Sequence, residues 1–297
     1  MSAFLTVVVS TRNRAHAIGA CFDALAQQTL PHDRFEVLVV DNASTDRTPE
    51  LLAAETERGR FPMRAMREPR PGLSIARNTG IEAARGDFIL FLDDDAVADP
   101  GWLETYARQA DAGAEIVQGR IAPWFERPRP AWLADHWLPR VGVVEHGPHP
   151  CALPGNLHGG NFGAARRVFD RVGTFREELG AGASGLGEDA EFTARAREAG
   201  CRIVYEPAAS VEHFIPRARC SRPAFFRRFY LHGRSQVLYN DYPEPLPRLL
   251  GYFAKITCLR FAQALLRRDA AAHMAAVCDW AEHLGRVVGI VRRRYGK

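Results

Sequence analysis

The stretch FILFLDDD, residues 88–95, decides the fold class, because an uninterrupted apolar run ends abruptly in three carboxylates. Apolar runs without polar alternation predict strands that are buried on both faces, which is typical of parallel sheets. Two similar runs come earlier, LTVVVS at 5–10 and FEVLVVD at 35–41. Helix-like stretches at 15–28, 48–58 and 75–84 separate the three runs. The sequence therefore predicts an α/β fold in which helices flank a mostly parallel sheet.

Polar side chains stand where each of the three predicted strands ends. Ser10, Asp41 and Asp93 close the runs in turn. In open parallel sheets the ligand crevice lies beyond the carboxyl ends of the strands. We therefore expect these three residues to meet at one edge and to face a ligand.

The rest of the chain is less regular and then helical. Residues 121–157 are rich in Pro and Trp and form a long excursion of the kind that often shapes a binding site. Order returns at GGNFGA, 159–164, and a strand at 201–207 precedes VEHF at 211–214. Beyond Pro223 the pattern is helical and amphipathic. We expect a catalytic domain over 1–216, in which 1–120 binds nucleotide and 121–216 binds the acceptor, and a basic helical region over 217–297.

The composition places the chain among globular proteins. It has 297 residues, of which 46% are hydrophobic. The six cysteines form no CxxC pair, so we interpret them as reduced thiols of a cytoplasmic protein. We expect residues 4–9 to form a strand and not a signal peptide. No apolar run reaches the roughly 18 residues of a membrane span.

The net charge of +4 hides a strong asymmetry along the chain. From Arg217 onward there are 16 basic and 5 acidic residues, a net of +11, which leaves 23 basic and 30 acidic residues, a net of −7, before it. A basic tail on an acidic body predicts an anionic partner for the tail.

The triplet Asp93, Asp94 and Asp95 predicts a cation site. Adjacent carboxylates repel one another and stay ionised only near a cation or hydrogen-bond donors. Mg²⁺ or Mn²⁺ prefers carboxylate oxygens and completes its shell with phosphate oxygens, so a diphosphate substrate fits. The alternative is that the triplet only begins a polar turn.

Five motifs in order resemble the family 2 glycosyltransferases of GT-A fold, over residues 5–214. They are VVVSTRNRA (7–15), VVDNASTD (39–46), GLSIARNTGIEAARGDFILFLDDDA (72–96), GGNFGA (159–164) and GLGEDAEF (185–192). The resemblance implies transfer of a sugar from a nucleoside diphosphate, with a divalent metal, Mn²⁺ or Mg²⁺. UDP is the nucleotide we expect, and GDP and dTDP stay open.

The resemblance also assigns roles to individual residues. The residues expected to contact the nucleotide sugar are Ser10, Thr11, Arg12, Asp41, Arg77, Asn78, Asp93, Asp94, Gly160 and Asn161. Within this set Asp41 would accept from the base, Asp93 would face the ribose, and Gly160 and Asn161, beside Gly159, would line the sugar. Asp95 and His213 would bind the metal. Simpler alternatives are a salt bridge of Arg77 to the triplet, a structural His213 and a turn at Asn161.

The pair Glu188 and Asp189 carries the expected catalysis. By resemblance the second acid, Asp189, is the general base that deprotonates the acceptor hydroxyl, and Glu188 orients the acceptor or holds the loop. Gly185 and Gly187 would let that loop approach the substrate. One carboxylate base predicts a single in-line displacement with inversion. The alternative is that both acids only favour the first turn of a helix.

The tail has two interpretations. FFRRFYLHGRSQV, 225–237, and RRRYGK, 292–297, mix aromatic and basic residues, as in helices that lie on an anionic membrane surface. Alternatively, the apolar face packs on the catalytic domain or on a second subunit of a homo-oligomer. Arg227, Arg228 and Arg234 are candidates to close over the diphosphate. No segment resembles a nucleic-acid-binding module.

Two other functions compete with glycosyl transfer. A nucleotidyltransferase of similar fold usually has a Gly-rich loop after its first strand, whereas STRNRAH, 10–16, has no glycine. A non-catalytic scaffold that binds nucleotide or glycan would be expected to lack the acidic motifs, which are present. The acceptor can be a glycan, a lipid-linked glycan or a metabolite, and we expect a role in polysaccharide biosynthesis, with the protein cytoplasmic or peripheral on the inner face of the membrane.

Overall fold

The computed structural model describes residues 2–240, 246–267 and 270–295 and divides the chain into two compact units. The sheet unit comprises the residues up to Trp124 together with 142–177 and 188–214. The helical unit comprises 125–141, 178–187 and the residues from Ile215 onward. The helical unit thus includes two segments, 125–141 and 178–187, that lie within the predicted catalytic domain, and the predicted functional division of the chain stays a prediction.

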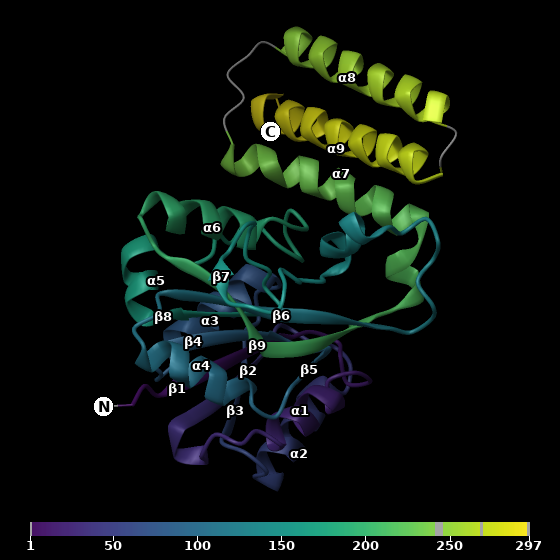
Figure 1. Ribbon diagram of the computed structural model, residues 1–297. Coiled ribbons are helices and arrows are strands. Elements are labelled where there is room, and N and C mark those ends of the chain that lie inside the picture. Colours follow the sequence, from purple (N-terminus) through teal and green to yellow (C-terminus); the bar gives the residue numbers. More distant parts are fainter. Residues whose placement is uncertain (1, 241–245, 268–269, 296–297) are drawn as a thin grey trace. The chain divides into compact units, whose positions relative to one another are not determined.

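The first half of the sheet unit is the predicted parallel α/β arrangement (Figure 1). Strands β3, β2, β1 and β4 lie side by side in this order and run parallel. Their bounds are β1 Leu5–Thr11, β2 Phe35–Asp41, β3 Met63–Arg67 and β4 Phe88–Asp93. The connections contain α1 Gly19–Ala26, η1 His32–Arg34, α2 Thr48–Arg58 and α3 Leu73–Ala83. Strand β3, MRAMR, was not predicted, because an edge strand with exposed polar residues carries no apolar run.

The second half of the sheet is antiparallel. Beyond β4 the order continues β8, β6, β9, β5, and β7 pairs with β9. The bounds are β5 Ala96–Ala98, α4 Trp102–Asp111, β6 Ile116–Phe125, η2 Asp135–Val141, β7 Cys151–Ala152, β8 Asn161–Ala165, α5 Arg166–Val172, α6 Glu188–Glu198 and β9 Ile203–Ile215. VEHF, expected to follow the last strand, is part of β9, so the backbone ladder holds His213 in place.

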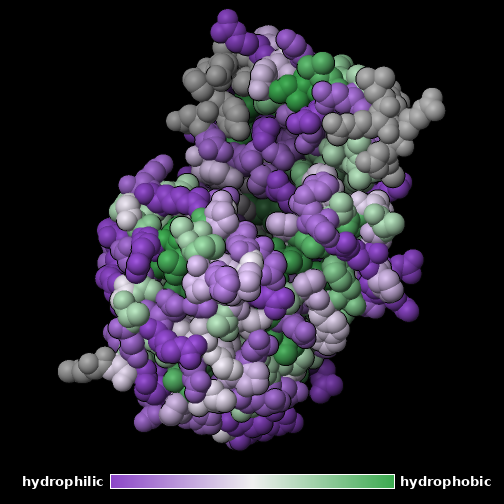
Figure 2. Space-filling model, in the orientation of Figure 1, coloured by the Kyte–Doolittle hydropathy of each residue, from purple (hydrophilic) through white to green (hydrophobic). Residues whose placement is uncertain are grey.

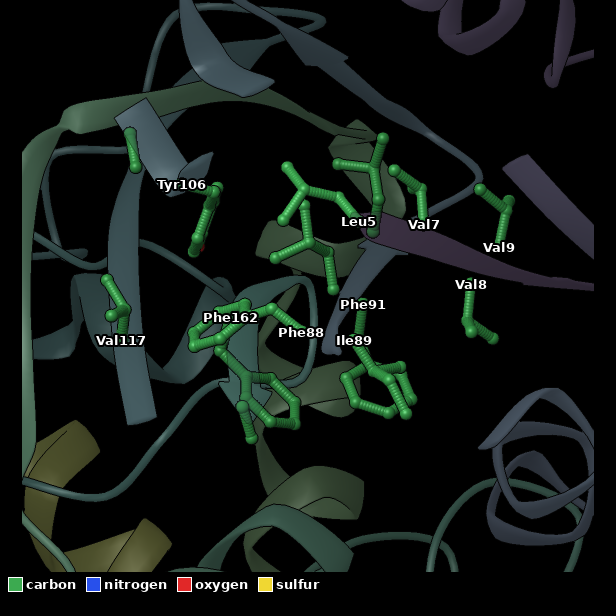
Figure 3. Packing of buried hydrophobic residues seen from close by; sticks show 14 of the residues in the cluster. Leu5, Val7, Val8, Val9, Phe88, Ile89, Phe91, Tyr106, Val117 and Phe162 are labelled. Carbon is green, nitrogen blue, oxygen red and sulfur yellow. The ribbon is translucent and has the colours of Figure 1, made fainter. Parts of the chain in front are cut away.

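The core of the sheet unit lies on both faces of the central strands. The visible surface of this unit is mostly hydrophilic (Figure 2), and the apolar side chains of β1, β4 and β8 pack inside (Figure 3). Phe91 stacks on Phe162 with ring centroids 4.8 Å apart, and both are fully buried. Burial of such a side chain contributes about 1.5–3 kcal/mol. The strands that carry the predicted site are thus anchored by buried apolar side chains.

The helical unit contains η3 Arg217–Cys220, α7 Arg222–Tyr239, α8 Leu246–Arg267 and α9 Ala270–Tyr295. Ser221 caps α7 by accepting a hydrogen bond from Ala224 N at 3.3 Å. A Cβ at Gly233 of α7 would lie 2.0 Å from Glu282 O of α9, so the glycine allows the two helices to approach closely. No helix in the described part of the chain is long and apolar enough to cross a membrane.

The aromatic residues of α7 pack inside the helical unit. Phe225 and Phe229 are almost fully buried. Trp132 lies edge-on to Phe225 at 5.0 Å, and Trp137 lies edge-on to Phe229 at 5.4 Å. This part of the 225–237 segment therefore follows the packing interpretation, because its aromatic rings already have protein partners.

Thiol reactivity tests the packing of both units. Cys151 and Cys258 are exposed, whereas Cys21, Cys201, Cys220 and Cys278 are buried. Burial raises the pKa of Cys278 to about 12 and that of Cys21 well above its ordinary value, so the reactive thiolate is scarce. We expect a maleimide at pH 7.5 to modify two cysteines rapidly and the other four only after unfolding, as followed by mass spectrometry. Rapid modification of Cys278 in the folded protein would contradict the packing of α9.

Candidate active site

The parallel register brings the three strand ends together. Ser10 pairs with Val40 on one side and with Asp93 on the other, and Thr11 is level with Asp41. The carboxyl ends of β1, β2 and β4 therefore form one edge, as the sequence predicts. Arg12 follows in the turn after β1 and is exposed.

The side chain of Asp94, like that of Asp95, is buried, whereas that of Asp93 is partly exposed. Thr11 Oγ1 donates a hydrogen bond to Asp94 Oδ2 at 2.7 Å, and Arg14 Nε lies 3.5 Å from Asp94 Oδ1. Burial raises the pKa of Asp94 to about 7, although Arg14 and Thr11 oppose the rise. Asp94 and Thr11, both expected to touch the nucleotide sugar, thus bind each other. The contact joins the end of β1 to the turn after β4.

Arg14 belongs to the site and was not singled out from the sequence. Its guanidinium contacts Asp94 and also Asp95, at 3.4 Å from Asp95 Oδ2. The only available signal was its place in STRNRA, four residues beyond the end of the apolar run. A half-exposed cation next to two carboxylates reduces their mutual repulsion.

Asp93, Asp95 and His213 form a candidate metal centre. One oxygen or nitrogen of each lies within 4.8 Å of the others. The antiparallel register of β5 and β9 sets Ala96 opposite His213, and His213 Nε2 lies 3.2 Å from Asp95 Oδ1. Two carboxylates and an imidazole form a donor set that suits Mn²⁺ or Mg²⁺. The geometry adds Asp93, expected at the ribose, to the two ligands predicted from the sequence.

Asp41 presents an acceptor to the edge. It is almost fully buried at the end of β2, and its Oδ1 accepts from Ser44 N at 3.2 Å. Among the residues that the structure describes, Asp41 Oδ2 and Ser10 Oγ have no hydrogen-bond partner. A buried acceptor without a donor costs about 1–3 kcal/mol, which an N–H of a bound base would offset.

Arg77 links three parts of the site. It projects from α3 and is 4% exposed. Its Nη1 donates to Glu188 Oε1 at 2.9 Å, its Nη2 donates to Gly159 O at 3.1 Å, and Asp93 Oδ1 lies 3.7 Å away. A Cβ at Gly159 would lie 2.3 Å from Arg77 Nη2, so the glycine allows this approach. The salt-bridge alternative for Arg77 therefore agrees with the structure, and it includes Glu188.

Gly160 is held close to the acidic triplet in the same way. Asp93 N donates to Gly160 O at 3.3 Å, and a Cβ at Gly160 would lie 2.6 Å from Asp93 Oδ2. A larger residue here would have to displace the Asp93 carboxylate.

Glu188 and Asp189 begin α6 but have different surroundings. Glu188 is buried, and burial and the neighbouring Asp189 raise its pKa while Arg77 opposes the rise. Asp189 is half-buried, and its Oδ2 accepts from Gly159 N at 3.3 Å. Both stand in the first turn, as the simpler alternative requires, but their partners are on α3 and before β8. Of the two acids, Asp189 is the more exposed.

Two asparagines expected at the substrate are part of the fold. Asn161 is fully buried: its Nδ2 donates to the carbonyls of Arg120 and Ala209, and its Oδ1 accepts from Trp102 Nε1 and Tyr106 OH, all at 2.8–2.9 Å. Asn78 donates to Phe175 O at 2.8 Å and accepts from Phe175 N at 3.0 Å. The expected contact of the Asn161 side chain with the sugar is wrong, because all of its hydrogen-bonding groups are used within the protein.

The glycine loop before α6 belongs to the helical unit. Gly185 and Gly187 have φ of 110° and 102°, which favour glycine. Arg234 of α7 donates to Ser184 O at 2.6 Å. This bond gives Arg234 a structural partner, and closure of Arg227, Arg228 and Arg234 over a diphosphate stays a prediction.

Comparison with known proteins gives consistent matches. The model of the family described as Glycosyl transferase family 2 matches residues 6–173. The chain is similar to the succinoglycan biosynthesis protein ExoO of Rhizobium meliloti, with 32% identity over 263 residues, 79% of this chain and 71% of ExoO. It is 34% identical to the glycosyltransferase AglE of Haloferax volcanii over 119 residues, which are 40% of this chain and only 39% of AglE.

Solved structures share the fold at low sequence identity. The mannosyltransferase PcManGT of Pyrobaculum calidifontis, in complex with GDP-Man and Mn²⁺, matches with a TM-score of 0.64 and 21% identity over 96% of this chain and 87% of its own. TarS 1–349 of S. aureus, in complex with UDP-GlcNAc, matches with a TM-score of 0.53 and 19% identity over 98% and 92%. The fold is therefore GT-A, with a helical C-terminal segment.

Proposed function

Because this chain belongs to glycosyl transferase family 2, we propose that it transfers a sugar from a nucleoside diphosphate to an acceptor hydroxyl. One observation carries the proposal: Asp93, Asp95 and His213 converge at the strand ends, where Asp41 keeps a buried acceptor without a donor. Such an edge can bind a base at one end and a diphosphate with its metal at the other. ExoO, a succinoglycan biosynthesis protein, supports a role in polysaccharide biosynthesis.

We propose that β1 and β2 bind the nucleoside. Asp41 Oδ2 would accept from the base N–H, and Ser10 and Arg12 would contact the base or ribose. Asp93, which belongs to the candidate metal group and lies close to Gly160, would contact either the ribose or the metal. UDP is the nucleotide we test first, and GDP follows because PcManGT binds GDP-Man.

The divalent cation would be held by Asp95 and His213, with Asp93 as the third ligand. When bound, Mn²⁺ or Mg²⁺ neutralises the charge that develops on the leaving diphosphate. Arg14, whose guanidinium lies beside Asp94 and Asp95, would reduce the repulsion among the carboxylates of the triplet.

We propose that Asp189 is the general base. The acceptor oxygen would attack the anomeric carbon while its proton passes to Asp189, and the bond from that carbon to the diphosphate oxygen would break. A single displacement of this kind inverts the anomeric centre. Glu188 would not compete for the proton, because it is buried and paired with Arg77. The acceptor is a glycan, a lipid-linked glycan or a metabolite hydroxyl.

Binding of nucleotides tests the proposal. We expect calorimetry to detect one of UDP, GDP, dTDP and CMP in the presence of Mn²⁺ and to show at least tenfold weaker binding without it. Asp95→Ala should remove the dependence on Mn²⁺, because the group loses the carboxylate that contacts His213. Asp170→Ala, an exposed aspartate of α5, is the matched control and should bind as the wild type does. If no nucleotide binds under any metal condition, transferase activity is untenable and a non-catalytic scaffold becomes the better explanation.

A further inference from the structure

The outer face of α8 combines apolar and cationic side chains. Arg248, Tyr252, Lys255 and Leu259 are spaced i, i+4, i+7 and i+11, which places them on one stripe of the helix. All four are exposed, Tyr252 by 59% and Leu259 by 53%. Figure 2 shows hydrophobic and hydrophilic atoms side by side over the upper helices, where Figure 1 places α8. We call these four residues the α8 stripe.

The opposite face of α8 has partners within the helical unit. Phe253 is 6% exposed and stacks on His283 of α9 at 4.8 Å. Thr257 Oγ1 lies 3.3 Å from His283 Nδ1, and Arg260 Nε lies 3.4 Å from Asp279 Oδ2. Packing on α9 therefore fixes the orientation of α8 and leaves the α8 stripe directed away from α9.

The charge of the α8 stripe selects its partner. The sequence of α8, residues 246–267, contains no Asp or Glu. Within the described residues, neither Arg248 nor Lys255 has an ion-pair partner, whereas Arg260 on the inner face has one. A partner of this surface must supply negative charge and also accept Tyr252 and Leu259.

We propose that the α8 stripe binds an anionic phospholipid surface, with the helix lying in the headgroup layer. Tyr252 and Leu259 would enter the acyl boundary, and Arg248 and Lys255 would extend their apolar stems and keep their charges at the phosphates. A second copy of the chain fits less well, because a contact between two stripes would gather four cations where α8 supplies no acidic side chain. The inference does not rest on the proposed sugar transfer.

Vesicle sedimentation of the full chain tests this proposal without any donor or acceptor. We expect binding to vesicles of phosphatidylcholine with phosphatidylglycerol, weakened by salt, and little binding to phosphatidylcholine alone. Each basic residue near such a surface strengthens binding about fivefold, so Arg248→Glu/Lys255→Glu should weaken it at least about 25-fold. Tyr252→Ser/Leu259→Ser should also weaken binding, at every salt concentration.

Matched variants of the sheet unit serve as controls. Arg85→Glu/Arg202→Glu reverses two exposed cations, and Trp124→Ser removes an aromatic ring that is 48% exposed. Both should leave vesicle binding within about twofold of the wild type. A change in the overall net charge affects binding much less than the loss of residues that touch the membrane, because salt screens distant charges. Equal weakening by Arg85→Glu/Arg202→Glu and Arg248→Glu/Lys255→Glu would overturn the proposal.

A fluorescent label distinguishes loss of binding from loss of folding. Cys258 is exposed on α8, and in a Cys151→Ser chain it is the single exposed thiol among those described. An environment-sensitive probe on Cys258 should shift to the blue with anionic vesicles and not with phosphatidylcholine. By circular dichroism, the variants of the α8 stripe should have the same helix content as the wild type. The absence of a blue shift would overturn the proposal. So would light scattering that shows the wild type as a dimer and Tyr252→Ser/Leu259→Ser as a monomer, if vesicle binding is unchanged.

Discussion

Replacing Asp189 with Asn is expected to lower the rate of sugar transfer by about 10²–10⁴-fold, the usual contribution of a general base. The amide oxygen of Asn can still accept from Gly159 N, as Asp189 Oδ2 does at 3.3 Å, so the local structure is kept. The amide cannot take the proton of the acceptor hydroxyl. The measurement is the rate at which nucleoside diphosphate is released from the nucleotide sugar that binds best, when the sugar is transferred to an acceptor or to water.

Nucleotide binding by the same variant distinguishes a loss of catalysis from a loss of folding. Asp189→Asn should bind the nucleotide with Mn²⁺ as tightly as the wild type. Asp170→Asn, an isosteric change at an exposed position of α5, should keep full activity. A variant Asp189→Asn that retains more than about one tenth of the wild-type rate would mean that another group accepts the proton.

Replacing Arg77 with Met is expected to destabilise the protein by about 3–5 kcal/mol, the cost of leaving one charge of a buried pair alone. Arg77 is 4% exposed, and Glu188 would lose its partner at 2.9 Å in a site where burial already raises its pKa. The carbonyl of Gly159 would lose its donor as well. Urea unfolding monitored by circular dichroism measures the change.

A second variant identifies the cause. Arg77→Met/Glu188→Gln removes both charges, so it should recover a large part of the lost stability. Arg85→Met removes an arginine whose side chain is 69% exposed and 4.0 Å from Glu36, and it should cost less than about 1 kcal/mol. If Arg77→Met is as mild as Arg85→Met, the pair with Glu188 is not a stabilising element of the site.

The fold was predictable where strands are buried on both faces. The apolar runs before Asp41 and Asp93 have no alternation, so they identified β2 and β4 and the edge at which both end. Edge strand β3 and the antiparallel strands β6 to β9 carry weaker patterns, and their order depends on contacts far apart in the chain. The local sequence could not predict that residues 178–187 belong to the helical unit. Their place there depends on contacts with α7, such as the hydrogen bond from Arg234 to Ser184 O.

The site was predictable as a set of motifs but not as a set of contacts. Asn161 lies in a motif that implies the sugar, yet four hydrogen bonds within the protein use its side chain. Arg14 showed no strong signal, and its contacts with Asp94 and Asp95 exist only because the turn after β1 lies beside the end of β4. A motif states which residue types are present, and hydrogen-bond partners depend on which elements are neighbours.

The sequence by itself determined the α/β class, the edge where Ser10, Asp41 and Asp93 meet, and the family. These follow from hydrophobic periodicity and from short motifs, which are local properties of the chain. Only the tertiary structure decided that Asp93 joins Asp95 and His213, and that Glu188 is buried against Arg77 while Asp189 stays accessible. The physical reason is that burial and pairing arise between residues far apart in the chain, 111 positions for Arg77 and Glu188, and no local pattern encodes them.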